Sequence, residues 1–184
     1  MIELYGDGTG NPEASDPVTV VYDPTGYVLY FGDSENDGIF AGAADGSGLT
    51  ELYSADNVRD IAIDAANNFI YWVDLDNIWR GNLDGTGVAS TIYDDMGGNL
   101  RAIEMDLATN RLFLGEFNVP GLDDVIWTVN ADSSSGSQTV IHSGDFGGIR
   151  GLTLESSSVV PEPSTYILFL TGLAALGIVK YRRK

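Results

Sequence analysis

Apolar and polar residues alternate along most of the chain in short runs, with a period of two rather than the 3.6 of a helix. Ile61 and Ile63, and later Ile103 and Met105, alternate with smaller or polar neighbours. Asn-Asn, Asp-Gly and Gly-Gly pairs, which are turn signals, separate runs of roughly four to six residues. The pattern predicts short antiparallel β-strands joined by tight turns.

The alternating pattern recurs three times, with Asp23, Asp64 and Asp106 separated by 41 and 42 residues. Each aspartate is followed by an aromatic residue, an acid, an apolar pair, a polar turn and a closing apolar pair. The aromatic residues are Tyr30, Tyr71 and Phe113, and the acids are Asp33, Asp74 and Glu116. The apolar pairs are Ile39-Phe40, Ile78-Trp79 and Ile126-Trp127, and the polar turns are residues 45–48, 84–87 and 132–136. The closing apolar pairs are Leu52-Tyr53, Ile92-Tyr93 and Val140-Ile141. Agreement at so many offsets indicates a structural repeat.

The repeat predicts an all-β fold. We place its units at about residues 18–53, 58–93 and 100–142, and in the middle unit we expect strands at about 60–64, 69–73, 78–82 and 90–93. Four strands in a unit of about 40 to 45 residues are typical of a β-propeller blade. We therefore expect residues 1–155 to form a partial β-propeller of four-stranded antiparallel blades, about three complete plus end strands. A short apolar helix is expected at the carboxyl end.

The middle unit also resembles a known family. Residues 69–74 and 78–85 are similar to the YWTD repeat of the low-density-lipoprotein-receptor class B family, with Val73 in place of the family's threonine. The flanking units match this motif less closely. The resemblance implies propeller blades, in which the matching residues have structural roles. These residues are Tyr71, Trp72, Asp74, Asp84 and Gly85.

The two ends of the repeat region do not complete a propeller. Residues 1–5 match a closing strand, and residues 149–154 match an opening strand. Three complete blades are also fewer than the usual four to eight. We expect that at least two strands, and about two whole blades, are missing before Met1. The alternatives are an open stack of blades with an exposed edge, or an oligomer that covers this edge.

The carboxyl end has a different composition. Residues 156–165 form a proline-containing linker, and residues 166–179 are the longest apolar run in the chain. Fourteen residues are short for a stable transmembrane span of about 20. Four of the nine basic residues follow directly, and they are expected to stay in the cytoplasm by the positive-inside rule. This basic tail consists of Lys180, Arg182, Arg183 and Lys184.

Linker, apolar run and basic tail together resemble the PEP-CTERM sorting signal of Gram-negative bacteria, whose motif is Val160, Pro161, Glu162, Pro163 and Ser164 here. The resemblance implies processing by an exosortase, a transient stay in the inner membrane through residues 166–179, and delivery to the cell surface or extracellular matrix, often in bacteria that make exopolysaccharide. A simple tail anchor is the alternative. Residues 1–10 lack the features of a signal peptide, in line with the missing blades.

Composition restricts the partners. The chain has 27 acidic and 9 basic residues, for a formal charge of −18, and a field of this sign repels nucleic acid. It could attract Ca²⁺ or basic partners, although a solvated acidic surface without a ligand is the simpler interpretation. The absence of cysteine excludes disulfides, thiolate metal sites and cysteine nucleophiles.

Few residues suggest chemistry, and we predict no catalytic residue. The single histidine, His142, falls on an expected outermost strand, and the glycine-rich turns lack the lysine of a phosphate-binding loop. Asp33, Glu35 and Asp37 have the spacing of half a Ca²⁺ loop, but Ala44 stands where the bidentate glutamate belongs. Acidic residues are also common in hairpin turns, which is the competing interpretation.

The tryptophans Trp72, Trp79 and Trp127 could line a sugar-binding face, although their place in the repeat first suggests packing between blades. We expect a non-enzymatic propeller that binds an extracellular polysaccharide or protein, or serves as a structural module of the matrix. The alternative is a metal-dependent propeller enzyme of the lactonase, lyase or hydrolase type. Asp60 and Glu104 occupy non-equivalent positions on first strands, so no ring of carboxylates is expected.

Overall fold

The computed structural model describes residues 16–94, 99–119, 123–132 and 137–154. They belong to the first of two compact units, residues 1–154 and 155–184. The expected closing strand at 1–5, the linker and sorting motif at 156–165, the apolar helix at 166–179 and the basic tail lie outside the described residues. Within those residues, no helix has the length and apolar character needed to cross a membrane.

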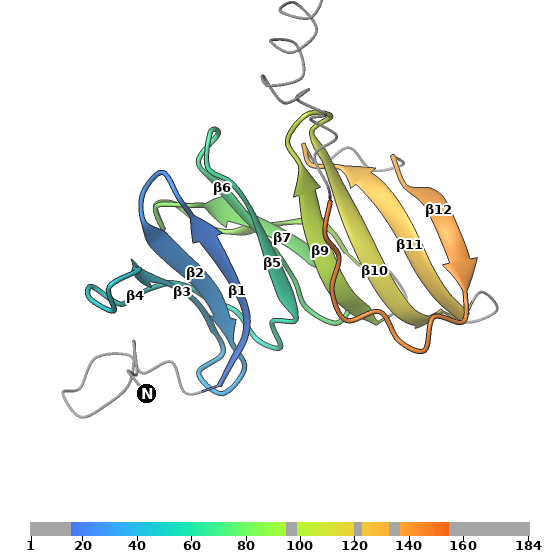
Figure 1. Ribbon diagram of the computed structural model, residues 1–184, viewed down its shortest axis with the longest axis horizontal. Coiled ribbons are helices and arrows are strands. Elements are labelled where there is room, and N and C mark those ends of the chain that lie inside the picture. Colours follow the sequence, from blue (N-terminus) through green and yellow to red (C-terminus); the bar gives the residue numbers. More distant parts are fainter. Residues whose placement is uncertain (1–15, 95–98, 120–122, 133–136, 155–184) are drawn as a thin grey trace, which may run out of the picture. The chain divides into compact units, whose positions relative to one another are not determined.

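The described residues form three four-stranded antiparallel sheets, in agreement with the predicted all-β class (Figure 1). Each sheet follows the chain order, so every connection within it is a hairpin. Sheet 1 contains β1 Pro17–Asp23, β2 Val28–Asp33, β3 Gly38–Ala43 and β4 Thr50–Ser54; sheet 2 contains β5 Asp60–Asp64, β6 Phe69–Val73, β7 Ile78–Asn82 and β8 Ser90–Tyr93; sheet 3 contains β9 Leu100–Asp106, β10 Arg111–Val119, β11 Asp123–Asn130 and β12 Thr139–Gly144. The four strands predicted in the middle unit agree with β5 to β8.

The recurring aspartates explain why the hairpins recur. In the turn between β5 and β6, the Asp64 carboxylate accepts hydrogen bonds from the Asn67 backbone N–H at 3.1 Å and from the Asn67 side chain at 2.7 Å. Asn68 follows in a left-handed conformation, with φ of 60°, which asparagine tolerates better than most residues. Asp23 and Asp106 also accept turn bonds, each from the backbone N–H two residues on, at Thr25 and Ala108. The repeated acids therefore act first as turn formers.

Sheet 2 contributes to two cores because its strand residues alternate between its two faces. In β6, Trp72 is buried in the core between sheets 1 and 2, together with Ile61 and Tyr53. Its neighbour Tyr71 is buried in the core between sheets 2 and 3, together with Leu112. Side chains at repeat-equivalent positions thus bury themselves against the next sheet, which is the packing of propeller blades.

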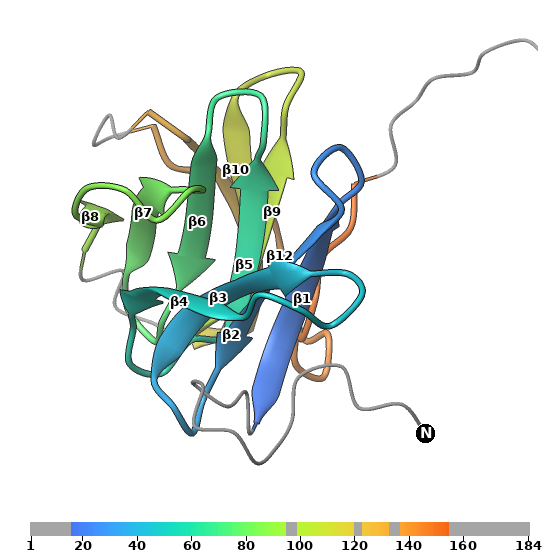
Figure 2. The ribbon, with the colours of Figure 1, turned by 90° about the vertical axis from the view of Figure 1, so that its left-hand side faces the viewer.

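The first strands of the three sheets, β1, β5 and β9, lie next to one another (Figures 1 and 2). Asp60 links them: its Oδ1 accepts a hydrogen bond from Thr19 Oγ1 of β1 at 2.6 Å, and its Oδ2 accepts one from the Ile103 backbone N–H of β9 at 3.0 Å. Close packing between sheets explains the glycine at position 32, because a Cβ on Gly32 would lie 2.4 Å from Val58 Cγ1. The same close approach recurs between Gly115 and Ile149, also at 2.4 Å.

The opening strand expected at residues 149–154 is not present as a strand. Ile149 is nevertheless buried on Gly115, in the place that Val58 occupies on Gly32. A strand is defined by hydrogen bonds to a neighbour, and no described residue follows Leu154 to supply one. The pattern thus identified the packing position correctly, but the expected strand was wrong.

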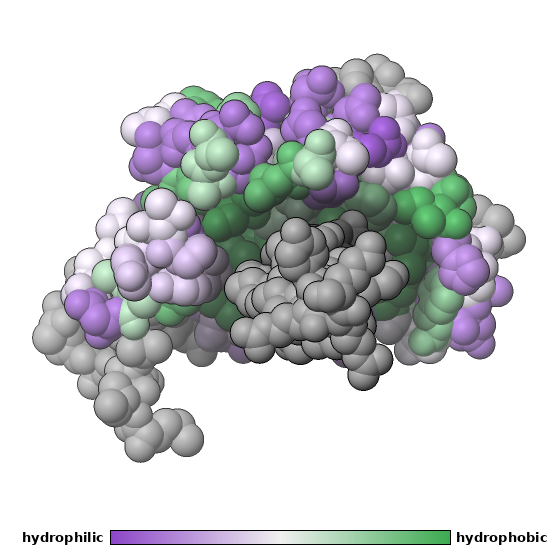
Figure 3. All heavy atoms as spheres, turned by 45° about the horizontal axis from the view of Figure 1, so that its top comes forward, coloured by the Kyte–Doolittle hydropathy of each residue, from purple (hydrophilic) through white to green (hydrophobic). Residues whose placement is uncertain are grey.

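Apolar side chains are not confined to the cores. Val18, Val20 and Tyr22 of β1 are 44%, 63% and 44% exposed on the face of sheet 1 that no other described sheet covers. In Figure 3, apolar residues (green) are visible on both sides of the central grey atoms, and polar residues (purple) gather mainly along the top of the view. At the other end of the array, β12 is exposed along its length and carries His142, which confirms the predicted surface position.

Candidate binding pocket between sheets 1 and 2

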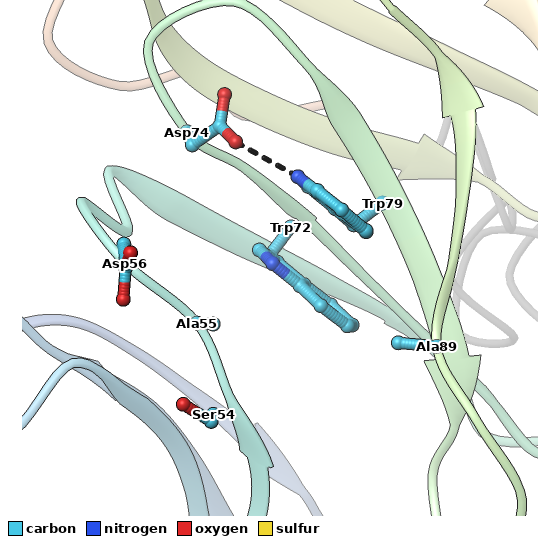
Figure 4. A pocket seen from close by; sticks show the side chains of 7 residues that line it. All are labelled: Ser54, Ala55, Asp56, Trp72, Asp74, Trp79 and Ala89. Carbon is cyan, nitrogen blue, oxygen red and sulfur yellow. Dashed lines mark hydrogen bonds between the residues drawn. The ribbon is translucent and has the colours of Figure 1, made fainter.

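A pocket of about 340 Å³ opens between sheets 1 and 2. One wall comes from the connection between β4 and β5, and the other from β6, β7 and the residue before β8 (Figure 4). The repeat places these segments together because the end of β6 lies beside the start of β5, with Val73 paired to Asp60. The lining residues are Ser54, Ala55, Asp56, Trp72, Asp74, Trp79 and Ala89.

Two parallel indoles dominate the pocket. The rings of Trp72 and Trp79 face each other on adjacent strands, with centroids 6.2 Å apart and planes within 7°. Tyr53 of sheet 1 stacks on Trp72 at 5.4 Å, so the indole pair is fixed to the neighbouring sheet. Trp72 is 2% exposed, whereas Trp79 is only half-buried and forms the accessible part of the aromatic wall.

Asp74 holds Trp79 in place rather than offering a free carboxylate. Its Oδ2 accepts a hydrogen bond from Trp79 Nε1 at 2.8 Å, and its Oδ1 accepts bonds from the backbone N–H groups of Asp76 and Asn77. Burial alone would raise the pKa of Asp74, but these hydrogen bonds and those from the Asn77 side chain outweigh it and lower the pKa. Asp74 therefore stays ionised and orients the indole.

Two polar groups at the pocket remain available for a ligand. Asp56 is exposed, and its carboxylate makes no hydrogen bond within the described residues. The Trp72 indole N–H likewise has no hydrogen-bond partner in that part of the chain, and Figure 4 shows its nitrogen on the side of Asp56. The pocket thus combines an aromatic wall, a free N–H donor and a free acidic acceptor. Such a set suits a ligand that has both apolar faces and hydroxyl groups.

Two further acids, Asp60 and Glu104, lie on the first strands β5 and β9. Burial raises the pKa of Asp60, and the hydrogen bonds from Thr19, Ile103 and Ile61 offset only part of this. Burial also raises the pKa of Glu104, and the nearby charge of Asp60 raises it further. Although Asp60 and Glu104 are not equivalent in the repeat, the neighbouring strands β5 and β9 bring them close. The hydrogen bonds that Asp60 accepts connect the three first strands.

The residues of the half Ca²⁺ loop are placed in a hairpin. Asp33 is fully buried, and its carboxylate accepts hydrogen bonds from the backbone N–H groups of Asp16, Glu35 and Asn36 at 2.8–3.0 Å. Glu35 and Asp37 are exposed. In the described part of the chain, no three acidic or histidine side chains come together in a group that could hold a metal ion.

The residues of the YWTD-like motif have placements typical of packing and turns. Tyr71 and Trp72 are buried in the two cores, and Asp74 forms the turn after β6. Asp84 accepts hydrogen bonds from the Thr86 backbone N–H and hydroxyl, and Gly85 adopts a φ of 72° in the same turn. The repeat residues thus build the pocket walls, while Asp56, which contributes the free carboxylate, lies outside every repeated motif.

Comparison with known proteins identifies the carboxyl end. A family model described as the PEP-CTERM protein-sorting motif matches residues 159–184, which confirms the predicted resemblance to this sorting signal. This signal indicates export and cell-surface sorting in Gram-negative bacteria, and it implies processing by an exosortase. No curated protein matches the sequence as a whole.

Solved structures with similar folds support the propeller assignment. A chain of the nidogen/laminin complex matches with a TM-score of 0.66 and 24% identity over 76% of this chain and 52% of that one. A gluconolactonase from Xanthomonas campestris matches with a TM-score of 0.57 and 13% identity, over 77% and 50%. A luciferin-regenerating enzyme matches with a TM-score of 0.54 and 14% identity, over 70% and 46%. The chain spans about half the length of these structures, and at such identities the likeness concerns the fold alone.

Proposed function

We propose that this chain is a non-catalytic binding module of the cell surface, and that its ligand is an extracellular polysaccharide. The sorting motif supports the location, since it implies export by the exosortase route. Residues 166–179 would hold the chain in the inner membrane until the exosortase acts, with the basic tail on the cytoplasmic side. The propeller would then be displayed outside the cell, with a polysaccharide within reach.

The observation that carries the proposal is the pair of parallel indoles beside a free N–H and a free carboxylate. A sugar ring presents C–H groups on its faces and hydroxyls at its rim. The half-buried indole of Trp79 offers a flat surface for the former. The Trp72 N–H and the Asp56 carboxylate offer a donor and an acceptor for the latter. Because Asp74 fixes the Trp79 ring, the surface is preorganised, which lowers the entropic cost of binding.

The test uses the full chain and a panel of soluble neutral oligosaccharides, with affinity measured by titration calorimetry. Trp79→Ala should weaken the best ligand about tenfold or more, which corresponds to roughly 1.4 kcal/mol. Asp56→Ala, an exposed position, should weaken it without changing the unfolding temperature. Tyr22→Ala, which removes an exposed aromatic residue from β1, is the matched control and should bind like the wild type. If Trp79→Ala and Asp56→Ala both keep full affinity, or if no oligosaccharide binds, the proposal is wrong.

A further inference from the structure

Apart from His142, five arginines are the only basic side chains among the described residues, and three of them occupy equivalent positions in the repeat. Arg59, Arg101 and Arg150 each follow a buried apolar residue at the start of a first strand or of the segment that takes its place. The preceding residues are Val58, Leu100 and Ile149, which are 0%, 0% and 8% exposed. The buried residue fixes the backbone, so the arginine after it is held at the same end of each sheet.

The fold brings these three arginines together. β5 and β9 are neighbours, and the bond from the Ile103 N–H to Asp60 joins them next to Arg59 and Arg101. Ile149 packs on Gly115, whose strand partner is Ala102, so Arg150 comes to the other side of Arg101. Burial, and then the charges of Arg59 and Arg150, lower the pKa of Arg101. Arg101 thus lies within electrostatic range of both Arg59 and Arg150, and we call the three residues the arginine row.

None of the three is paired within the described residues: no hydrogen bond or ion pair joins their side chains to another group there. Arg59 Nε is shielded from solvent and has no hydrogen-bond partner in that part of the chain. The remaining arginines are different, since Arg111 donates to Thr128 and Asn130, and Arg80 donates to the Ala131 carbonyl. In a chain with 27 acidic residues, unpaired cations gathered at one place are unexpected, because ordinary ion pairing would compensate them.

We infer that the arginine row is a second binding site, which takes the carboxylate groups of a uronate-containing polysaccharide. A guanidinium group matches a carboxylate in a planar, bidentate arrangement, and a row along adjacent blades suits acidic groups that repeat along a polymer. The row lies at the same end of the sheets as the Trp72–Trp79 pocket, since Arg59 precedes β5 where Asp74 follows the paired strand β6. The inference rests on the proposed function and names the class of polysaccharide.

The decisive experiment measures binding of the full chain to an oligogalacturonate and to the neutral oligosaccharide found above, at low ionic strength. Arg101→Gln and Arg150→Gln should each weaken the oligogalacturonate about tenfold and reduce the dependence of affinity on salt. Arg101→Lys should fall between the wild type and Arg101→Gln, because lysine keeps the charge but loses the bidentate geometry. Arg80→Gln, which removes an equal charge outside the row, should leave both affinities unchanged.

The outcomes separate the two proposals. If the neutral ligand binds through Trp79 but the arginine variants bind oligogalacturonate like the wild type, the uronate site is refuted and the proposed function stands. If an acidic peptide binds more tightly than oligogalacturonate and depends on Arg101, the partner is a protein and the inference is also wrong. Unfolding temperatures guard against misfolding, and Arg150 is exposed, so Arg150→Gln should unfold like the wild type. Arg101→Gln should be no less stable, because it relieves repulsion within the row.

Discussion

The hydroxyl of Tyr53 provides a sensitive test of how sheets 1 and 2 are joined. It accepts a hydrogen bond from the Asn82 backbone N–H at 2.8 Å and donates to the Asn82 carbonyl at 2.9 Å. The pairing of β7 with β8 runs only from Ile78 to Arg80, so the hydroxyl occupies the place that a neighbouring strand would take. The Tyr53 ring also covers Gly81, where a Cβ would lie 2.5 Å from the ring. Tyr53→Phe removes the hydroxyl and leaves this ring packing unchanged.

The expected cost follows from the two bonds lost. Each hydrogen bond contributes about 0.5–1.5 kcal/mol net, so their sum is about 1–3 kcal/mol. Asn82 is half-buried, and water can take over part of this bonding. We therefore expect Tyr53→Phe to lower the free energy of unfolding by about 1–2 kcal/mol. The stacking of the ring on Trp72 persists, so the affinity of the pocket should not change.

Urea unfolding of the full chain, followed by tryptophan fluorescence, measures this difference by linear extrapolation. Tyr27→Phe is the matched control: Tyr27 is 70% exposed, and its hydroxyl makes no hydrogen bond in the described residues. If Tyr53→Phe and Tyr27→Phe both stay within about 0.5 kcal/mol of the wild type, the range of ordinary surface substitutions, the bonds to Asn82 do not support the junction. The account of how the two sheets are held together would then fail.

Three further predictions concern other sites. Burial raises the pKa of Glu116, and its Oε1 has no hydrogen-bond partner among the described residues, so Glu116→Gln should stabilise the protein at neutral pH. The charged form of Glu116 destabilises the folded protein at pH values above its raised pKa, so the gain should shrink as the pH falls through that pKa and be gone by about pH 4. Chemical unfolding at several pH values measures this, and a constant gain would contradict it. Gly32→Ala should lower the free energy of unfolding by about 1–3 kcal/mol, because the new Cβ clashes with Val58 Cγ1. Adding Val58→Ala should partly restore this stability. Gly151→Ala, which has open space around its Cβ, is the control for these unfolding measurements. Millimolar Ca²⁺ should not shift the unfolding temperature, because the Asp33 carboxylate is occupied by backbone N–H groups; a clear upward shift would establish the half Ca²⁺ loop as a site.

The sequence predicted the strands of the middle unit because local patterns determine them. The alternation of Ile61 and Ile63 and the turn-forming Asp64 act within a few residues, so spacing alone reveals them. The same holds for the packing position of Ile149. The strand predicted at residues 149–154 was wrong because strand pairing depends on a partner that the local pattern does not contain.

The candidate sites depend on contacts between sheets, and the local sequence pattern does not predict these contacts. The Trp72–Trp79 pair was recognised as packing, but its accessible face and the free Asp56 emerge only when sheets 1 and 2 meet. Arg59, Arg101 and Arg150 stand at matching offsets in the repeat, but an offset does not show whether an arginine is paired. Arg80 and Arg111 make hydrogen bonds in the structure, whereas the three other arginines have none from their side chains within the described residues. Spacing gave the positions, and three-dimensional neighbours gave the chemistry.

The turn aspartates contribute to the acidity of this protein, but its architecture does not depend on their charge. Asp45, Asp84 and Asp106 bond to nearby N–H or hydroxyl groups of their own turns, and these bonds lower the pKa of each carboxyl group. An asparagine carbonyl can accept the same turn bonds without carrying charge. Exchanging Asp45, Asp84 and Asp106 for asparagine should therefore remove up to three negative charges while the hairpins persist. Such exchanges would change the surface potential of this protein with little influence on blade geometry.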